Sequence, residues 1–286
     1  MQDSNRWSVV TAMVDLERYP IDRPGPTLDA LLDGIREDLR QSGCAVLSGF
    51  IQPRSIDALV AECDRVQSAA HRSFNRTNPY FTQDRDDLPD SHPLRRFYER
   101  SNAFVPADQF GPDSAIRSLY EWPPFAPFIQ AALQESSFHR YGDPLADVIV
   151  NLAEAGNGFP WHFDTNNYTV TLAIQNAEHG GEFEFSPGLR TPTDENYEGV
   201  AAVLDGNQRL VRRLSLQPGD LQIFRGRYSL HRVAPIAGSR RRYVAIYSFA
   251  ERPDMIGSPE RTRQLYGRVL PLHVERAGRR SDSLVD

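Results

Sequence analysis

The chain shows two kinds of hydrophobic periodicity. Apolar residues recur at helical spacing between residues 28 and 39 and stop before Gly43, which predicts an amphipathic helix with Thr27 as its N-cap. The apolar run CAVLSGF over 44–50 then predicts a buried strand, and an apolar stripe over about 54–70 predicts a second helix. Both helices are expected to pack against a sheet.

From about residue 145 the pattern changes to short apolar segments separated by turn residues. The segments are ADVIVNLA, FPWHFD, YTVTLAIQ, GEFEFSP, RLVRRLSL, DLQIFRG, YSLHRVAPI and RRRYVAIYSFA. Pairs such as Gly180-Gly181 and Pro218-Gly219 mark corners between them. This half predicts an antiparallel sandwich or barrel, and the run over 258–269 predicts a helix packed back on it.

With 286 residues the chain is long enough to form one large domain, which we predict over 1–286. Within it we expect an N-terminal helical support with the first strand, an irregular lid or substrate wall, a β core, and a C-terminal helix with a tail. The respective ranges are 1–74, 75–144, 145–250 and 251–286. The second segment is rich in Pro, Arg and aromatic residues and lacks a sustained period until about residue 114, a texture typical of binding loops.

Composition excludes several functions. All 32 basic residues are arginine, so neither a Schiff-base lysine nor a Walker-type phosphate loop is present. The net charge of -6 disfavours a nucleic-acid partner. No window reaches the eighteen or so apolar residues of a membrane helix, and the N-terminus lacks the features of a secretory signal. We therefore predict a cytoplasmic protein with no membrane partner.

The two cysteines, Cys44 and Cys63, lack metal-ligand spacing and are predicted to be buried, reduced thiols. The pair His162 and Asp164 is more informative. Residues two apart in a strand point to the same face, so both would project together, as two ligands of one metal ion do. His231 offers a third ligand, and two His with one carboxylate suit non-haem Fe(II), which keeps coordination positions open.

Each of these motifs is weak by itself, because a strand His is more often a hydrogen-bonded residue than a ligand. Their combination is specific: WHFD, GGEFEFSP, QPGDLQIFRG, HRVAPI and SRRRYVAIYSF together resemble the Fe(II)- and 2-oxoglutarate-dependent oxygenases. This resemblance implies a mainly β fold with flanking helices around a distorted double-stranded β-helix, jelly-roll or cupin-like, core. It also implies Fe(II), 2-oxoglutarate as cosubstrate and O2, with His162, Asp164 and His231 as iron ligands and catalytic residues.

The resemblance further implies that Arg242 binds the distal carboxylate of 2-oxoglutarate. Arg240 shares its strand face and is the reserve candidate, and Asn151 on an earlier strand is a third cofactor-binding candidate. An arginine at these positions can bind a carboxylate with two parallel hydrogen bonds.

Within this superfamily the run WHFDTNNYTVTLAIQNAEHGGEFEFSPGLR resembles bacterial radical halogenases of free amino acids, lysine halogenases in particular, and their hydroxylating relatives. The halogenases carry Gly where this chain has Asp164, and chloride takes the vacant iron site. A carboxylate at that position implies hydroxylation of a C–H bond, with 2-oxoglutarate converted to succinate and CO2.

The resemblance implies a small amino acid as substrate, held by its carboxylate and amine. The candidates for a carboxylate clamp are Arg95, Arg96, Arg100 and Asn102. A cationic side chain, as in lysine, arginine or ornithine, would need a partner such as Asp143 or Asp147. The substrate-binding residues that we predict are Thr165 and Asn167, which follow the ligand pair, together with Arg96 and Asn102.

Other readings stay open on the sequence. The same chemistry could act on an amino-acid derivative, a carrier-tethered substrate or a protein. A catalytically silent β-barrel that binds an effector is the alternative from another class, although such a protein has no need of all three ligands and the arginine. A nucleic-acid demethylase is disfavoured by the acidic balance. The exact substrate, the carbon oxidised, hydroxylation against desaturation, and a homodimer are left undecided.

Overall fold

The structure is a computed structural model that describes residues 2–275, so the part of the predicted tail over 276–286 lies outside the described residues. The α-helices are α1 (Gln2–Met13), α2 (Pro26–Ser42), α3 (Ile56–Val66), α4 (Ala115–Glu121), α5 (Phe125–Leu133), α6 (Tyr197–Leu204), α7 (Pro259–Tyr266) and α8 (Pro271–Glu275). The strands are β1 (Cys44–Leu47), β2 (His71–Thr77), β3 (Tyr98–Val105), β4 (His139–Arg140), β5 (Val148–Ala153), β6 (Phe159–His162), β7 (Thr169–Gln175), β8 (His179–Gly180), β9 (Phe183–Ser186), β10 (Arg212–Leu214), β11 (Leu221–Phe224), β12 (Leu230–Val233), β13 (Ile236–Ala237) and β14 (Arg242–Ala250).

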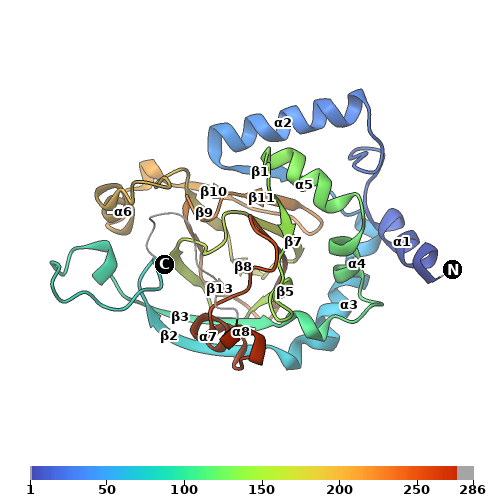
Figure 1. Ribbon diagram of the computed structural model, residues 1–286. Coiled ribbons are helices and arrows are strands. Elements are labelled where there is room, and N and C mark those ends of the chain that lie inside the picture. Colours follow the sequence, from blue (N-terminus) through green and yellow to red (C-terminus); the bar gives the residue numbers. More distant parts are fainter. Residues whose placement is uncertain (1, 276–286) are drawn as a thin grey trace.

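Two antiparallel sheets form the centre of the molecule (Figure 1). The larger has eight strands in the order β1-β11-β7-β14-β5-β3-β2, with β4 pairing to β14 off this path. The smaller has four strands in the order β10-β9-β12-β6, and β13 pairs separately with β8. Strands distant in sequence are therefore neighbours, which gives the mainly β architecture that the alternating pattern predicts.

Helices cover one face of the larger sheet, and the other face lines a cavity. In Figure 1, α1 to α5 lie together on one side of the strands, while α7 and α8 lie beside β2 and β3. The residues of strand β14 alternate between these two faces of the sheet. Its odd-numbered residues over 243–249 belong to the core packed under the helices, and its even-numbered residues over 242–248 line the cavity, because successive side chains in a strand point to opposite faces.

The predicted elements of the first half are largely confirmed. Helix α2 ends at Gly43, which has a φ of 66° and whose N–H bonds to Leu39 O. Its N-cap is Gly25 rather than Thr27, because Pro26 occupies the first helical position, where its fixed φ is favourable. Both cysteines are free and buried, as expected. Helices α1, α6 and α8 are additional to those that the sequence predicted.

The segment over 75–144 contains α4 and α5 where the sequence suggests helical pieces after residue 114. Strands β3 and β4 were not expected, and β3 pairs with both β2 and β5. The period of β3 is hidden in the sequence because two polar side chains, Arg100 and Asn102, are among its buried residues, 2% and 4% exposed. A strand that buries polar groups does not show the usual alternation of apolar and polar residues.

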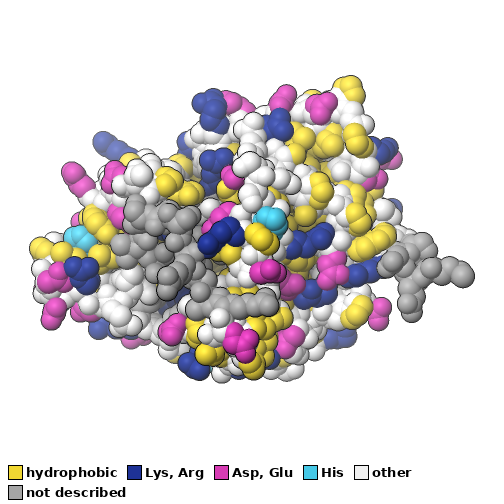
Figure 2. Space-filling view, in the orientation of Figure 1, with side chains coloured by type: hydrophobic (Ala, Val, Ile, Leu, Met, Phe, Trp, Pro, Cys, Tyr) yellow, Lys and Arg dark blue, Asp and Glu magenta, His cyan; other side chains and the backbone are white. Residues whose placement is uncertain are grey.

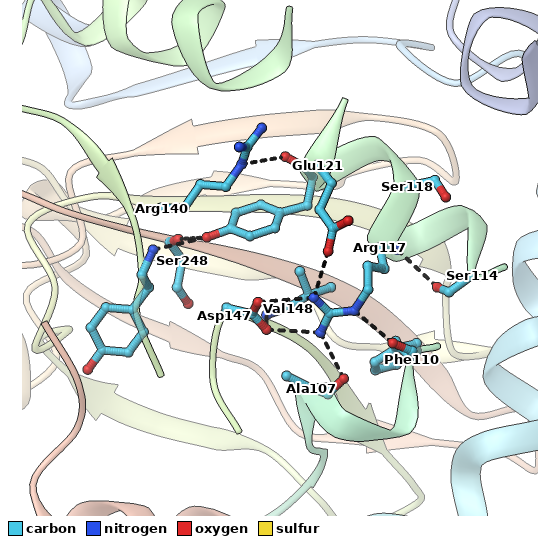
Figure 3. A network of polar contacts seen from close by, with 12 residues as sticks. Ala107, Phe110, Ser114, Arg117, Ser118, Glu121, Arg140, Asp147, Val148 and Ser248 are labelled. Carbon is cyan, nitrogen blue, oxygen red and sulfur yellow. Dashed lines mark hydrogen bonds and ion pairs between the residues drawn. The ribbon is translucent and has the colours of Figure 1, made fainter. Parts of the chain in front are cut away.

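An arginine on α4 fastens the helical layer to the larger sheet (Figure 3). Arg117 donates to both carboxylate oxygens of Asp147, immediately before β5, at 3.0 Å each. It also donates to Glu121 at 3.1 Å, Phe110 O at 2.7 Å and Ala107 O at 2.9 Å. Each nitrogen of this guanidinium therefore has at least one acceptor, as a charged group removed from water requires.

On the face shown in Figure 2, arginine and acidic side chains are interspersed. Exposed ion pairs among the described residues include Arg40 with Glu37 and Arg85 with Asp87. Within the part of the chain that the structure describes, no helix has the length and apolar character needed to cross a membrane.

Candidate metal centre

Two strands of the smaller sheet bring together the three predicted metal ligands. His162 is the last residue of β6 and lies directly opposite His231 of β12 in the antiparallel register. Asp164 lies two residues beyond the end of β6, where its N–H bonds to Gly226 O at 3.1 Å. Asp164 Oδ1 is 3.6 Å from His162 Nε2 and 3.4 Å from His231 Nε2. The pair thus points the same way, although Asp164 itself is outside the strand.

This donor set fits a metal ion. The ligand atoms of His162, Asp164 and His231 all lie within 4.8 Å of one another. Two atoms each about 2.1 Å from one ion lie about 3 Å apart when they subtend a right angle, which is near the observed separations. Three protein ligands on one side leave positions open for a cosubstrate.

The ring orientation of both histidines suits coordination. His162 Nδ1 lies 2.8 Å from Pro160 O and His231 Nδ1 lies 2.9 Å from Ser229 O. A carbonyl oxygen can only accept, so each Nδ1 carries the proton and each Nε2 presents its lone pair toward Asp164. Burial, with His231 adding to it, lowers the pKa of His162 to about 3, which keeps its imidazole in the neutral form that binds metals.

Asp164 is held in place and in its ionised form. Thr169 Oγ1 donates to its Oδ2 at 2.5 Å, which leaves Oδ1 facing the two histidines. A Cβ at position 226 would collide with Oδ2, so Gly226 is required for this close approach. Burial by itself raises the pKa of Asp164, but positive charge at His231 and His162 outweighs it and holds that pKa well below its usual range. With both imidazoles neutral, a bound divalent ion would supply that positive charge instead.

The three side chains open into a cavity of about 200 Å³ between the sheets. Aromatic rings form the wall next to the ligands. The ring centroid of Phe159 lies 4.4 Å from that of His162, and the centroid of Phe224 lies 4.9 Å from that of His231. Such walls exclude water from the centre, where electrostatic interactions are correspondingly stronger.

Arg242, the first residue of β14, lies in this cavity and is only 7% exposed. No hydrogen bond or ion pair from its guanidinium to another described residue is present, and burial lowers its pKa to about 10. Gly181 makes room for it, since a Cβ there would lie 3.1 Å from Arg242 Cδ. Asn151 also lines the cavity and donates from Nδ2 to Ala103 O at 3.3 Å.

Arg240 is not brought to the cavity. It is exposed and donates to Asn176 O at 2.8 Å and to Ala177 O at 3.2 Å. The reason is that β14 begins only at Arg242, so the strand face that we assigned to both arginines does not extend back to residue 240.

The predicted substrate-binding residues are placed differently from one another. Thr165 lines the cavity, whereas Asn167 is not among its lining residues. Arg96 also lies away from the cavity and pairs with Asp205 at 2.8 Å. Asn102 lies beneath a cavity residue: its amide oxygen accepts from Arg100 Nε at 2.8 Å and from Nη2 at 3.0 Å.

The two acids considered for a cationic substrate are both engaged. Asp143 lines the cavity, but its carboxylate lies 3.0 Å from His273 Nε2 and accepts from the N–H groups of Leu145 and Gly257 at 2.8 and 3.0 Å. Asp147 belongs to the Arg117 network. Neither carboxylate is free to bind an ammonium group.

The sequence reasoning missed several residues of the cavity. They are Thr169, Thr171, Gln222 and Arg261. The first three had a signal, because each is a polar residue between apolar ones on β7 or β11, and such positions face a polar interior when a strand is covered on both sides. Arg261 of α7 had none, since its place depends on how that helix docks on β2 and β3.

The comparisons with known proteins agree with this architecture. A family model described as Halogenase D matches residues 28–266. No curated protein matches the chain.

Three solved structures illustrate the fold. The epimerase SnoN, in complex with Fe3+, alpha ketoglutarate and nogalamycin RO, is 16% identical and is similar over 78% of this chain and 84% of its own, with a TM-score of 0.53. AviO1 from Streptomyces viridochromogenes Tue57 is 16% identical over 78% of this chain and 96% of its own, with a TM-score of 0.53. The alpha ketoglutarate dependent carbocyclase SnoK is 14% identical over 81% and 91%, with a TM-score of 0.52. The predicted mainly β, jelly-roll fold with flanking helices is thereby confirmed.

Proposed function

The chain belongs to the Halogenase D family, and from this premise we propose that it is an Fe(II)- and 2-oxoglutarate-dependent oxygenase that hydroxylates an unactivated C–H bond of a small amino acid or amino-acid derivative. The epimerase and the carbocyclase among the structural neighbours show that this fold hosts other outcomes as well. The proposal therefore depends on this chain's own residues.

The observation that carries the proposal is the position of Asp164. Its Oδ1 faces both histidine Nε2 atoms, and its Oδ2 is bound by Thr169. In the halogenases that the sequence resembles, Gly stands at this position and chloride takes the site. A carboxylate fixed at the place of the halide supports transfer of oxygen rather than of chlorine to the substrate.

Arg242 is the residue that we expect to bind the distal carboxylate of 2-oxoglutarate. A buried guanidinium without an acidic partner is costly, and a carboxylate that pairs with it in two parallel hydrogen bonds offsets that cost. Asn151 on the neighbouring strand is the second polar group expected to touch this cosubstrate.

When bound, iron and 2-oxoglutarate supply the oxidation, in which 2-oxoglutarate becomes succinate and CO2 while one oxygen atom of O2 enters the substrate. The chain's own contribution is to orient the three ligands and to keep Asp164 ionised. Phe159 and Phe224 exclude water next to the centre, which suppresses side reactions.

The test is to load the protein with Fe(II) anaerobically, add 2-oxoglutarate and a panel of free amino acids, and admit O2. We expect succinate release that depends on one class of amino acid, with a product heavier by one oxygen atom. Asp164→Ala should bind Mn(II) more than about 100-fold less tightly in calorimetry, since loss of an outer-sphere partner alone costs about 10- to 100-fold. Asp86→Ala, at an exposed aspartate, is the matched control and should bind as the unaltered protein does.

Asp164→Gly is the sharper variant. It should lose hydroxylation, and in chloride-containing buffer it is expected to yield a chlorinated product. Full metal affinity in Asp164→Ala would contradict the ligand assignment. Tight metal and 2-oxoglutarate binding without turnover of any free amino acid would instead favour a carrier-tethered or protein substrate.

A further inference from the structure

Two arginines from different parts of the chain meet in the cavity beside the metal centre. Arg100 comes from β3 and Arg261 from α7, and both line the cavity. Arg100 is 2% exposed, and Asn102 holds its Nε and Nη2 while Nη1 has no partner. Arg261 donates from Nη1 to Gln264 at 2.7 Å, and its Nε is buried without a partner. Neither arginine has an acidic partner among the described residues.

A single aromatic ring, Phe81, connects the two arginines with the centre. The guanidinium carbon of Arg100 lies 4.8 Å from the Phe81 ring centroid, and that of Arg261 lies 3.8 Å from it. The same ring lies 5.6 Å from the ring of His162. Arg100 also lies 3.9 Å from the Phe159 ring, which itself contacts His162. Both cations are thus one aromatic ring away from a metal ligand.

The backbone at Phe81 is strained to achieve this placement. Its φ of 61° is in the left-handed region, which bulky residues rarely adopt. Asn78 stabilises the turn, because its Oδ1 accepts from the N–H groups of Tyr80 and Thr82 and its Nδ2 donates to Leu94 O. A costly conformation maintained by a buried network indicates that the position of this ring matters to the site.

The charges of the cavity do not balance without an anionic ligand. A divalent ion with Asp164 leaves one positive charge, Arg242 adds another, and the two carboxylates of 2-oxoglutarate neutralise both. The charges of Arg100 and Arg261 remain, and the other carboxylate that lines the cavity, Asp143, offsets one of them at most. Burial and the nearby Arg261 hold the pKa of Arg100 well below its usual range, although the Asp164 carboxylate acts in the opposite direction.

No group in the cavity is suited to a cationic substrate. The carboxylates that line it are Asp164, at the metal centre, and Asp143, which is engaged by His273 and two backbone N–H groups. An ammonium group placed here would face the two arginines, and like charges brought together in a desolvated site repel each other.

Resting on the proposed function, we infer that the substrate is a small acid of net negative charge, such as an acidic amino acid, and that Arg100 and Arg261 together bind one of its carboxylates next to the metal centre. Phe81, whose ring centroid lies within 4.8 Å of both guanidinium carbons, positions the two side chains. A cationic amino acid, which the sequence left open as a substrate, does not fit this arrangement.

The test measures binding rather than turnover. Protein loaded with Mn(II) and saturating 2-oxoglutarate without O2 is titrated calorimetrically with glutamate, aspartate, leucine, ornithine and lysine, and with inorganic phosphate as a competing anion. We expect glutamate or aspartate to bind at least about tenfold more tightly than leucine, and lysine and ornithine to bind least, because a charge-assisted hydrogen bond contributes enough for that difference. The preference should weaken as salt is raised.

Substitutions in α7 test whether Arg261 causes the preference for an acidic substrate. Arg261→Gln should weaken binding of the acid at least about tenfold, whereas Arg263→Gln, at an exposed arginine on the same helix, should leave it unchanged. Arg261→Glu should reverse the preference and favour lysine. Arg100→Lys is the second variant, because it keeps the positive charge but removes the planar guanidinium that Asn102 binds. We expect this variant to bind the acid more weakly.

The outcomes separate this inference from the proposed function. Failure to bind Mn(II) or 2-oxoglutarate would overturn the proposed function. If both bind, equal or tighter binding of lysine, tighter binding of phosphate than of any carboxylate, or acid binding unaffected by Arg261→Gln would each overturn the inference alone.

Discussion

Arg117 and the three arginines of the cavity, Arg100, Arg242 and Arg261, are all largely removed from water. Of these four, Arg117 has acidic partners among the described residues and the other three do not. Arg117 has a bidentate partner in Asp147, a further partner in Glu121 and two backbone carbonyls (Figure 3). Arg100, Arg242 and Arg261 lie in the cavity without any acidic partner among the residues that the structure describes. The same residue type therefore performs two tasks in one chain.

This difference distinguishes a buried arginine that stabilises the fold from buried arginines that are available to bind a ligand. A buried charge is tolerated when it is paired, and Arg117 is paired within the chain, so its network links α4 to the sheet. An unpaired buried charge lowers stability, and it persists where a ligand supplies the missing partner. Arg100, Arg242 and Arg261, which lack an acidic partner among the described residues, all line the cavity at the metal centre.

The largest effect that would sharpen this contrast is expected for Arg242→Met. Loss of one partner of a buried charge pair costs about 3 kcal/mol, so the Kd for 2-oxoglutarate of the Mn(II)-loaded protein should rise by roughly 100-fold. The free energy of unfolding without 2-oxoglutarate should stay equal or increase, because a desolvated cation is removed. Calorimetry and urea unfolding measure the two quantities.

Arg241→Met is the matched control, since Arg241 lies next to Arg242 but forms an outward-facing ion pair with Glu154. It should change neither quantity by more than about 0.5 kcal/mol. A drop in stability with unchanged 2-oxoglutarate affinity in Arg242→Met would show that this arginine serves the fold instead.

The opposite profile is expected for Arg117→Met. The substitution leaves Asp147 without its guanidinium and should lower the free energy of unfolding by about 2 kcal/mol, somewhat less than for a fully buried pair, because both side chains are partly exposed. Affinity for Mn(II) and 2-oxoglutarate in the folded protein should stay unchanged. Arg40→Met, at an exposed helix pair, is the control and should leave the free energy of unfolding nearly unchanged.

The smallest effect concerns acid stability. Burial alone raises the pKa of Glu121, but hydrogen bonds from Arg117 and Arg6 outweigh it and hold that pKa below its ordinary value of 4.5. A carboxyl with a lowered pKa in the folded state stabilises above its unfolded pKa, and this contribution is lost as pH falls through the folded pKa. Urea unfolding from about pH 7 down to about pH 3 should therefore show a loss that Glu121→Gln reduces by about 1 kcal/mol or less. An identical pH dependence in the variant would contradict this account.

Much of the fold could be predicted from local pattern. The strands of the second half follow the alternating segments, and α2, α3 and α7 follow helical periodicity or caps, because these signals depend on neighbours in sequence. The pattern failed at β3, where buried polar residues hide the strand period, and at Arg240, where the strand begins later than assumed.

By itself the sequence predicted that His162 and Asp164 project together, which holds although Asp164 lies beyond the end of β6, and it favoured Arg242 over Arg240 from the apolar alternation that follows. Only the tertiary structure decided that His231 lies opposite His162, that Asp143 is already engaged by His273, and that Arg100 and Arg261 share one cavity. Strand pairing and helix docking bring together residues that are far apart in the chain. The net charge that lines a cavity depends on all the residues brought together in this way, so a local sequence pattern does not reveal it.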